Sequence, residues 1–369
     1  MIKRAVKTFF KSEISIGITL LISAILALLA ANSPAFPLYQ NFLKTSFLNF
    51  TIHHFINDTL MALFFLLVGL ELKKEILGGE LASKDKIILP AVAAFGGIII
   101  PALIFILFNL NNPQNLRGFA IPTATDIAFA YGMISLFGKR ISNSLKIFLV
   151  ALAVLDDMVA ILIIAFFYSQ NLDFTYLALA FLIMALLAFV NFKNSDKISI
   201  YLILGIFLWM FLLKSGIHAS LSGVILALFI PNKNLLPTLA HKISPAVNFL
   251  ILPLFAFANA GVRIEELSLE IFTEPLVLGI IFGLFFGKQI GVMLFSYLAV
   301  KFKITNLPKG ASWLEFWGVA IFTGIGFTMS LFIGALAFDD NDAVKIGVLA
   351  GSFLSAVFGF LVLKYVHRS

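Results

Sequence analysis

Two adjacent carboxylates, Asp156 and Asp157, lie within the apolar stretch LKIFLVALAVLDDMVAILIIAFF. A charge in the middle of a membrane is costly, so an intramembrane acid indicates a function. Neighbours on a helix point about 100° apart, so one carboxylate can face a cavity and the other an adjacent helix. Carboxylate oxygens are hard ligands suited to Na⁺, Li⁺ or H⁺. Two carboxylates this close cannot both stay ionised without a cation. We therefore expect at least one of them to hold a proton when no cation is bound.

A third acid, Asp126, lies in RGFAIPTATDIAFAYG, where Pro122, Thr123 and Thr125 precede it. Proline removes a helix hydrogen bond, and backbone released at membrane depth is tolerated only beside protein or a water-filled cavity. The pattern therefore predicts an interrupted helix with a functional acid. The simpler alternative is a proline kink with a hydrogen-bonded aspartate.

One cation, Lys288, lies within the apolar stretch LGIIFGLFFGKQIGVMLFSYLAV. A buried ammonium needs a carboxylate partner or must lose its proton. The residue is too central to extend to the membrane surface. We therefore expect it opposite Asp126 or Asp156.

A second unusual segment, LEFWGVAIFTGIGFTMSLFIGALAF, contains Gly324 and Gly326 among threonines and a serine, but no central acid. Interrupted segments at matching positions in two halves of a chain indicate a transport site. The alternative is close helix packing through small residues.

Other polar positions give weaker indications. Glu71 and Glu75 are one helical turn apart, beside Lys74, at the end of an apolar run. Such a group is either a solvated helix end or a proton-collecting, pH-sensing site. His218, in KSGIHASLSG, is either a packing histidine or a group that titrates near neutral pH.

The elements that position these residues must be membrane helices. Of the 369 residues, 61% are hydrophobic and 12% are charged, and the mean hydropathy is +1.04. These values exclude a soluble enzyme, a disordered protein and a nucleic-acid module, and the unbroken apolar runs exclude a β-barrel. Cysteine is absent, so disulfide and thiol chemistry are excluded too. The composition predicts an all-α polytopic membrane protein. We expect this protein to use no cofactor.

We expect one transmembrane transporter domain over residues 1–369, with inverted three-helix repeats at about 87–168 and 275–365 and two interrupted helices. A basic arm (MIKRAVKTFFK) would precede the first helix on the membrane surface. The twelve predicted transmembrane helices are 13–31, 58–77, 87–108, 120–138, 145–168, 174–191, 198–213, 216–230, 246–264, 275–300, 314–338 and 343–365.

The distribution of charge predicts the orientation. With twelve helices, 20 of the 26 Lys and Arg fall on the side of the N-terminus, 5 fall on the other side, and Lys288 lies within a helix. Because cytoplasmic loops carry the excess of Lys and Arg, both termini should be cytoplasmic.

The sequence closely resembles the NhaA family of sodium/proton antiporters over nearly its whole length. The similar stretches, in family order, are NDTLMALFFLLVGLELKKE, AIPTATDIAFAYG, LKIFLVALAVLDDMVAI, LKSGIHASLSGVILALFIP, ILPLFAFANAG, LGIIFGLFFGKQIG and GIGFTMSLFIGALAF. This family is itself an established example of inverted repeats and broken helices, so the resemblance and the repeat argument are not independent.

The resemblance implies that Asp156 and Asp157 carry the cation and protons, with Thr125 near the cation. Asp126 and Lys288 would neutralise the facing ends of two crossing broken helices, and Lys288 would pair with Asp156 when no sodium is bound. The residues that match a pH-sensing group are Glu71, Lys74, Glu75 and His218.

Two departures from the family matter. Ala240 precedes His241 where relatives typically have a glutamate, which implies a weaker pH sensor or a shifted set point. The connection after the first helix is shorter than usual and shows no hairpin with a Gly turn. In the family that hairpin joins two protomers, so its loss would count against a homodimer.

We therefore expect an electrogenic Na⁺(Li⁺)/H⁺ antiporter of a bacterial inner membrane, serving pH and sodium homeostasis, with Na⁺, Li⁺, H⁺ and the lipid bilayer as its partners. Cation and protons would compete for the Asp pair by alternating access. One alternative is a sodium-coupled symporter of the same fold. The other, an intramembrane aspartyl protease, needs two aspartates on different helices facing one water, which Asp156 and Asp157 cannot provide.

Overall fold

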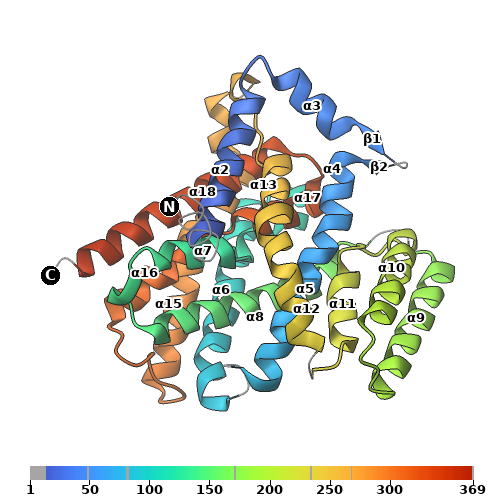
Figure 1. The fold of residues 1–369 in the computed structure, drawn as a ribbon. Coiled ribbons are helices and arrows are strands. Elements are labelled where there is room, and N and C mark those ends of the chain that lie inside the picture. Colours follow the sequence, from blue (N-terminus) through green and yellow to red (C-terminus); the bar gives the residue numbers. More distant parts are fainter. Residues whose placement is uncertain are drawn as a thin grey trace, which may run out of the picture. The chain divides into compact units, whose positions relative to one another are not determined.

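The computed structural model describes most of the chain, in the ranges 14–47, 50–79, 83–169, 172–232, 235–266 and 268–367. The predicted basic arm at the N-terminus lies outside these ranges. Within them the chain is almost entirely helical (Figure 1). Apolar runs form helices because lipid offers no hydrogen-bond partners, and in a helix the backbone N–H and carbonyl groups bond to each other. The elements before residue 141 are α2 (Ile14–Ala31), α3 (Phe36–Lys44), β1 (Ser46–Phe47), β2 (Phe50–Thr51), α4 (Ile52–His54), η1 (Phe55–Leu60), α5 (Met61–Gly78), α6 (Lys84–Phe108), η3 (Pro113–Gly118), η4 (Ile121–Thr123), α7 (Ile127–Ser135) and η5 (Gly138–Arg140).

The second half continues in the same way. Its elements are α8 (Asn143–Phe167), α9 (Phe174–Phe192), α10 (Ile198–Ser215), α11 (Leu221–Phe229), α12 (Leu235–Ala246), η6 (Val247–Ile251), α13 (Leu252–Asn259), η7 (Ile264–Glu266), η8 (Leu269–Thr273), α14 (Pro275–Phe282), η9 (Gly283–Gly287), α15 (Lys288–Lys301), α16 (Trp313–Phe322), α17 (Phe327–Phe338) and α18 (Asp342–Val366).

In the described part of the chain, nine continuous helices are long and apolar enough to cross a membrane. A tenth candidate is the pair α16 and α17, which is bent by 42° at a short break. The prediction of a polytopic helical membrane protein is therefore confirmed. Two of the twelve predicted helices, 120–138 and 216–230, instead contain α-helices of only nine residues each, α7 and α11.

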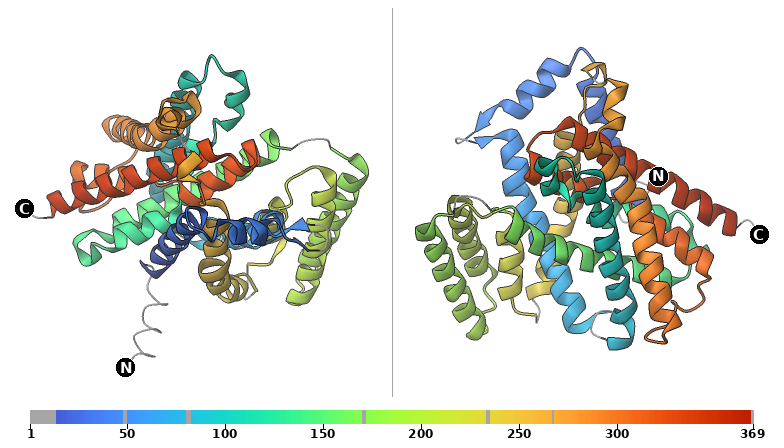
Figure 2. Two further views of the ribbon diagram at one scale, coloured as in Figure 1. Left: turned by 90° about the horizontal axis from the view of Figure 1, so that it is seen from above. Right: turned by 180° about the vertical axis from the view of Figure 1, so that it is seen from behind.

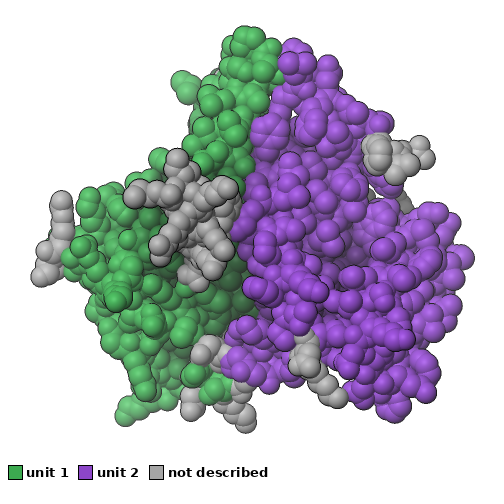
Figure 3. Space-filling view, viewed as in Figure 1, with its two compact units in different colours: residues 1–36, 83–160, 259–369 green, residues 37–82, 161–258 purple. Residues whose placement is uncertain are grey.

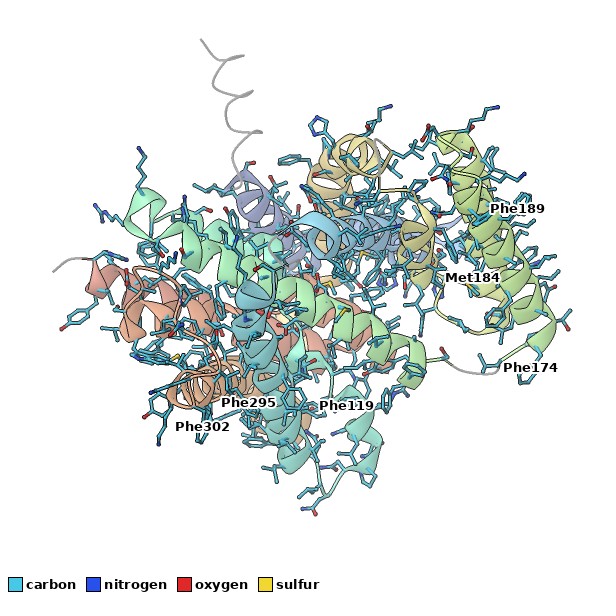
Figure 4. All side chains as sticks on the ribbon, turned by 90° about the horizontal axis from the view of Figure 1, so that it is seen from below. Phe119, Phe174, Met184, Phe189, Phe295 and Phe302 are labelled. Atoms are coloured by element: carbon cyan, nitrogen blue, oxygen red, sulfur yellow. The ribbon has the colours of Figure 1, made fainter. Side chains whose placement is uncertain are left out.

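Large apolar side chains on the outside of the helices agree with a lipid environment. Phe174 and Phe189 project from α9, and Phe302 follows α15 (Figure 4). Their exposed fractions are 76%, 57% and 69%. Water would oppose such exposure, whereas hydrocarbon chains favour it.

The described chain divides into two compact units (Figure 3). Unit 1 comprises residues 1–36, 83–160 and 259–369. Within it α6 and α15 run side by side (Figure 2, right), and α18 packs against α14 and α16. The approach of α6 to α15 requires glycine, because a Cβ on Gly96 would lie 2.3 Å from the carbonyl oxygen of Gly291.

Unit 2 comprises residues 37–82 and 161–258. Here α5 packs against α11 at Gly223, where a Cβ would lie 2.0 Å from the carbonyl oxygen of Ala62. Helices α9 and α10 pack against each other, and the buried core of the unit includes Tyr201, Leu208 and Leu236.

Two predicted boundaries were wrong because neighbouring helices are continuous. The helix predicted at 58–77 begins at Ile52 and passes through the π-helix η1. The helix predicted at 246–264 runs from Leu235 to Asn259 and includes the π-helix η6. Pro245 lies within the second helix.

The absence of a hairpin after the first helix was also predicted wrongly. Strands β1 and β2 form a two-stranded antiparallel sheet, with Ser46 opposite Thr51 and Phe47 opposite Phe50. The N-terminal end of α4 follows at once, capped by the Thr51 side chain, which accepts from the His54 backbone N–H at 3.1 Å. A sheet of two residues per strand is too short for a visible alternating pattern in the sequence.

Helix α10 ends at Gly216, which has φ 83° in the left-handed region that glycine adopts without strain. Residues up to Ser220 then form turns before α11 begins. The helix predicted at 216–230 therefore begins only at Leu221.

Candidate functional site

The first break separates the turn η4 from α7. Pro122 and Thr123 lie in η4, Ala124 is extended, and Asp126 has φ −78° and ψ 98° at the start of α7. Proline lacks a backbone N–H, and an aspartate whose side chain accepts from the backbone three residues later is a favoured helix start. The Oδ1 atom of Asp126 accepts from the Phe129 N–H at 2.9 Å.

The second break lies between α16 and α17, at residues 323–326. Gly324 is required there, since a Cβ would lie 2.3 Å from the carbonyl oxygen of Leu284. Ser352, on α18, accepts from the backbone N–H groups of Gly326 and Phe327 at 3.2 and 3.0 Å. Its side chain thereby caps the start of α17.

The two breaks lie against each other within unit 1, because hydrogen bonds join them. The Asp126 N–H donates to the Ile325 carbonyl at 2.7 Å. The Ser330 hydroxyl donates to the Ile121 carbonyl at 2.7 Å. Backbone groups that a continuous helix would satisfy internally are here satisfied across the pair.

One carboxylate caps helices at both breaks. While Oδ1 of Asp126 caps α7, Oδ2 accepts from the Thr328 N–H at 3.1 Å and from its hydroxyl at 2.6 Å. Asp126 is only 2% exposed. A negative charge at two helix N-termini is stabilised by both helix dipoles.

The predicted partner of Lys288 is Asp156. Their side chains are fully buried, and Lys288 Nζ lies 2.5 Å from Asp156 Oδ2. Asp156 comes from α8 and Lys288 from the first residue of α15. Asp157, also on α8, is 2% exposed. The attraction within a buried ion pair offsets part of the cost of removing both charges from water.

Thr125 connects this ion pair to the breaks. Its Oγ1 lies 2.7 Å from Asp156 Oδ2 and 2.8 Å from the carbonyl oxygen of Thr323. A hydroxyl has one hydrogen, so it donates to one of these oxygens at a time. We call Thr125, Asp126, Asp156, Asp157 and Lys288 the break site. Its oxygen atoms suit a hard monovalent cation or a proton.

The predicted pH-sensing residues lie elsewhere, in unit 2. Glu71 and Lys74 are exposed and Glu75 is half-buried near the end of α5; we call these three residues the α5-end cluster. His218 is half-buried after α10, with its Nε2 3.0 Å from the Tyr168 carbonyl. The contact indicates the tautomer with a hydrogen on Nε2.

Some polar contacts were missed by sequence reasoning. Lys73 donates to the carbonyls of Leu228 and Ile230, both at 2.6 Å, and so neutralises the C-terminal end of α11. Ser352 was missed because a serine among small residues is ordinary in a membrane helix. Gln289, next to Lys288, was a visible signal, since an uncharged amide within an apolar run also needs partners.

A helical membrane protein with two contacting helix breaks and a neutralised carboxylate at them belongs to the class of secondary transporters. The particular family follows from comparison with known proteins. The sequence profile described as Na⁺/H⁺ antiporter 1 matches residues 7–363. The chain belongs to this family of antiporters, which are transporters and not enzymes.

Similar proteins carry the same name in several bacteria. The Na(+)/H(+) antiporter NhaA of Pelagibacter ubique is 50% identical over 98% of this chain and 97% of its own length. That of Nitrobacter hamburgensis is 51% identical over 97% of this chain and 91% of its own. That of Rhodospirillum rubrum is 48% identical over 99% and 98%. The similarity extends over nearly the whole length of each chain.

Proposed function

We propose that the protein exchanges Na⁺ or Li⁺ for H⁺ across the bacterial inner membrane, moving net charge and serving sodium and pH homeostasis. The observation that supports this most directly is the buried contact of Lys288 with Asp156, beside Asp157 and Thr125. A bound cation can replace the ammonium as the partner of the carboxylate. An exchanger needs a carboxylate that can pair either with the transported cation or with another positive group.

Each residue of the break site has a role in this proposal. Asp156 and Asp157 bind the cation or protons, and the Thr125 hydroxyl lies near the cation. Lys288 neutralises Asp156 when no cation is bound. Asp126 neutralises two helix ends, which its hydrogen bonds to α7 and α17 support. The site is then filled in every state, by a cation, protons or Lys288, which limits leakage.

The proposal includes the topology. Twelve helices would cross the membrane if the segments of α7 and α11 also span it, and both termini would be cytoplasmic. The whole chain would act as one transporter domain, with inverted repeats near 87–168 and 275–365. Access would alternate between the two sides of the membrane.

Two further features belong to the proposal. Glu71, Lys74, Glu75 and His218 would sense pH, with a set point altered by Ala240. The paired strands β1 and β2 supply the element that joins protomers in the family, so we include a homodimer.

The decisive experiment measures transport by purified protein in liposomes over a grid of pH and Na⁺ concentration. If Na⁺ and H⁺ share one site, the apparent KM for Na⁺ rises about tenfold for each unit by which the pH is lowered, for each proton displaced. The maximal rate changes much less. Li⁺ should substitute for Na⁺. A KM independent of pH would contradict a shared site. Na⁺-driven uptake of an organic anion without proton exchange would favour the symporter.

A further inference from the structure

The orientation of Lys288 depends on the π-helix that precedes it. Between α14 and α15 the chain forms η9, and the Lys288 N–H closes this turn by donating to the Gly283 carbonyl. A π-helix contains one residue more per turn than an α-helix, so it rotates everything that follows by about 100°. Without it the side chain of residue 288 would point elsewhere. The π-helix therefore determines whether the ammonium meets Asp156.

One face of η9 is held by close packing. A Cβ on Gly283 would lie 2.6 Å from Cβ of Pro122, in the first break. A Cβ on Gly287 would lie 2.7 Å from Cα of Pro101, on α6. These contacts fix the π-helix against the first break and α6, while Leu284 of η9 packs against Gly351 on α18.

The side chain of Gln289, the residue after Lys288, adds a polar contact to η9. Gln289 is 7% exposed. Its Nε2 donates to the Phe285 carbonyl inside η9 at 2.6 Å, and its Oε1 accepts from the Trp317 Nε1–H at 3.0 Å. A carbonyl only accepts and an indole N–H only donates, so one orientation of the amide satisfies both partners.

The bridge reaches α16, the helix that ends at the second break. Trp317 lies on α16, and the ring of Phe358, on α18, packs edge-on against both Phe285 and Trp317, with centroids 5.6 and 6.2 Å apart. The amide thus connects the π-helix to the broken helix, and an aromatic cluster supports the connection.

We propose that Gln289, through Trp317, is a positioning residue that holds the Lys288 ammonium on Asp156 and thereby sets how strongly it competes with Na⁺. The proposal rests on the sodium/proton exchange proposed above. Gln289 touches neither the cation nor Asp156 in this account. It acts by fixing the turn from which Lys288 extends.

The sign of the expected effect is specific. When the bridge is lost, the ammonium is held less firmly, so Na⁺ meets a weaker competitor at Asp156. The apparent KM for Na⁺ at fixed alkaline pH should fall about two- to tenfold, the range expected for one buried hydrogen bond, and the maximal rate should fall as well. General damage to the fold would lower the rate without lowering KM.

The variants are Trp317→Phe, which keeps an aromatic ring beside Phe358, and Gln289→Met, which keeps the length of the side chain. Both should lower KM, and the double variant should do no more than Gln289→Met alone. Trp313→Phe is the matched control on the same helix, because Trp313 makes ring contacts with Tyr297 and Phe316. It should leave KM unchanged. Unchanged KM values in both bridge variants, or additive effects, would overturn the proposal.

A second measurement does not depend on transport. The melting temperature of the purified full-length protein is compared for Gln289→Met, Lys288→Ala and the variant that carries both of these substitutions. If Gln289 acts by positioning Lys288, its substitution should cost less once Lys288 is gone, so the losses are not additive. Additive losses would contradict the positioning role. If instead the unsubstituted protein moves no protons with Na⁺ while the losses remain non-additive, the transport proposal fails and the positioning contact stands.

Discussion

The break site and the α5-end cluster both contain charged groups near apolar helices, but they differ in how the charges are compensated. At the break site, Asp156 and Lys288 are fully buried and 2.5 Å apart, and Asp126 accepts three hydrogen bonds. In the α5-end cluster, Glu71 and Lys74 are exposed. Burial makes each partner indispensable, whereas water can replace a lost partner at the surface. The comparison separates the residues that we propose bind the ions from those that we propose adjust transport.

The largest effect should follow from Asp157→Asn at the break site. Asparagine is nearly the same size but cannot carry the charge that balances Na⁺. We expect no Na⁺-driven proton movement in liposomes and a melting temperature close to that of the unsubstituted protein. Exchange at the normal rate by a folded Asp157→Asn variant would remove this residue from the site.

Lys288→Ala should reduce stability as well as activity. Removing one partner of a buried ion pair leaves the other charge uncompensated, at a cost of about 3–5 kcal/mol in the free energy of unfolding. The measurement is thermal or denaturant unfolding of the purified protein. Lys74→Ala is the control in the α5-end cluster, with a change within about 0.5 kcal/mol.

The same experiment contains its own check. Lys288→Ala combined with Asp156→Ala removes both charges and should be more stable than Lys288→Ala alone. If the single variant unfolds at the temperature of the unsubstituted protein, the buried pair contributes nothing and the contrast between the two regions is lost.

Asp126 offers a comparison of caps. Asp126→Ala removes the cap of two helices, at about 1 kcal/mol for each, whereas Asp173→Ala in unit 2 removes the cap of α9 alone. Hydrogen exchange measured by mass spectrometry should show faster exchange at the starts of both α7 and α17 in the first variant. In the second variant only α9 should change. Protection retained in α17 of Asp126→Ala would mean that Asp126 does not cap it.

The sequence predicted the elements of unit 1 that depend on neighbouring residues. The run around Asp156 gave a transmembrane helix, and Pro122 with Asp126 gave the first break, because proline and an N-cap act within one turn. The hydrogen bond from Asp126 to Phe129 is local in the same sense.

What the sequence could not predict depends on distant residues. Asp156 and Lys288 are 132 positions apart, so the residues alone left both Asp126 and Asp156 as candidates, and only the family resemblance indicated Asp156. The hydrogen bonds from Thr328 to Asp126 cross 202 positions. The π-helix η9 has no local pattern that distinguishes it from an α-helix, since tertiary contacts at Gly283 and Gly287 stabilise it.

The smallest effect should come from the α5-end cluster, and it tests the comparison most sharply. Glu71→Gln with Glu75→Gln removes two carboxylates that water or nearby charges can replace, so the pH profile should shift by less than about one unit and the maximal rate should persist. In the proposed function Na⁺ and H⁺ compete at the break site, so saturating Na⁺ should still extend activity to lower pH in this double variant. The data are rates at several Na⁺ concentrations across the active pH range, compared with Lys74→Ala. If added Na⁺ no longer rescues activity at low pH, protons act through Glu71 or Glu75 and not at Asp156 and Asp157, and the division into a binding region and an adjusting region is wrong.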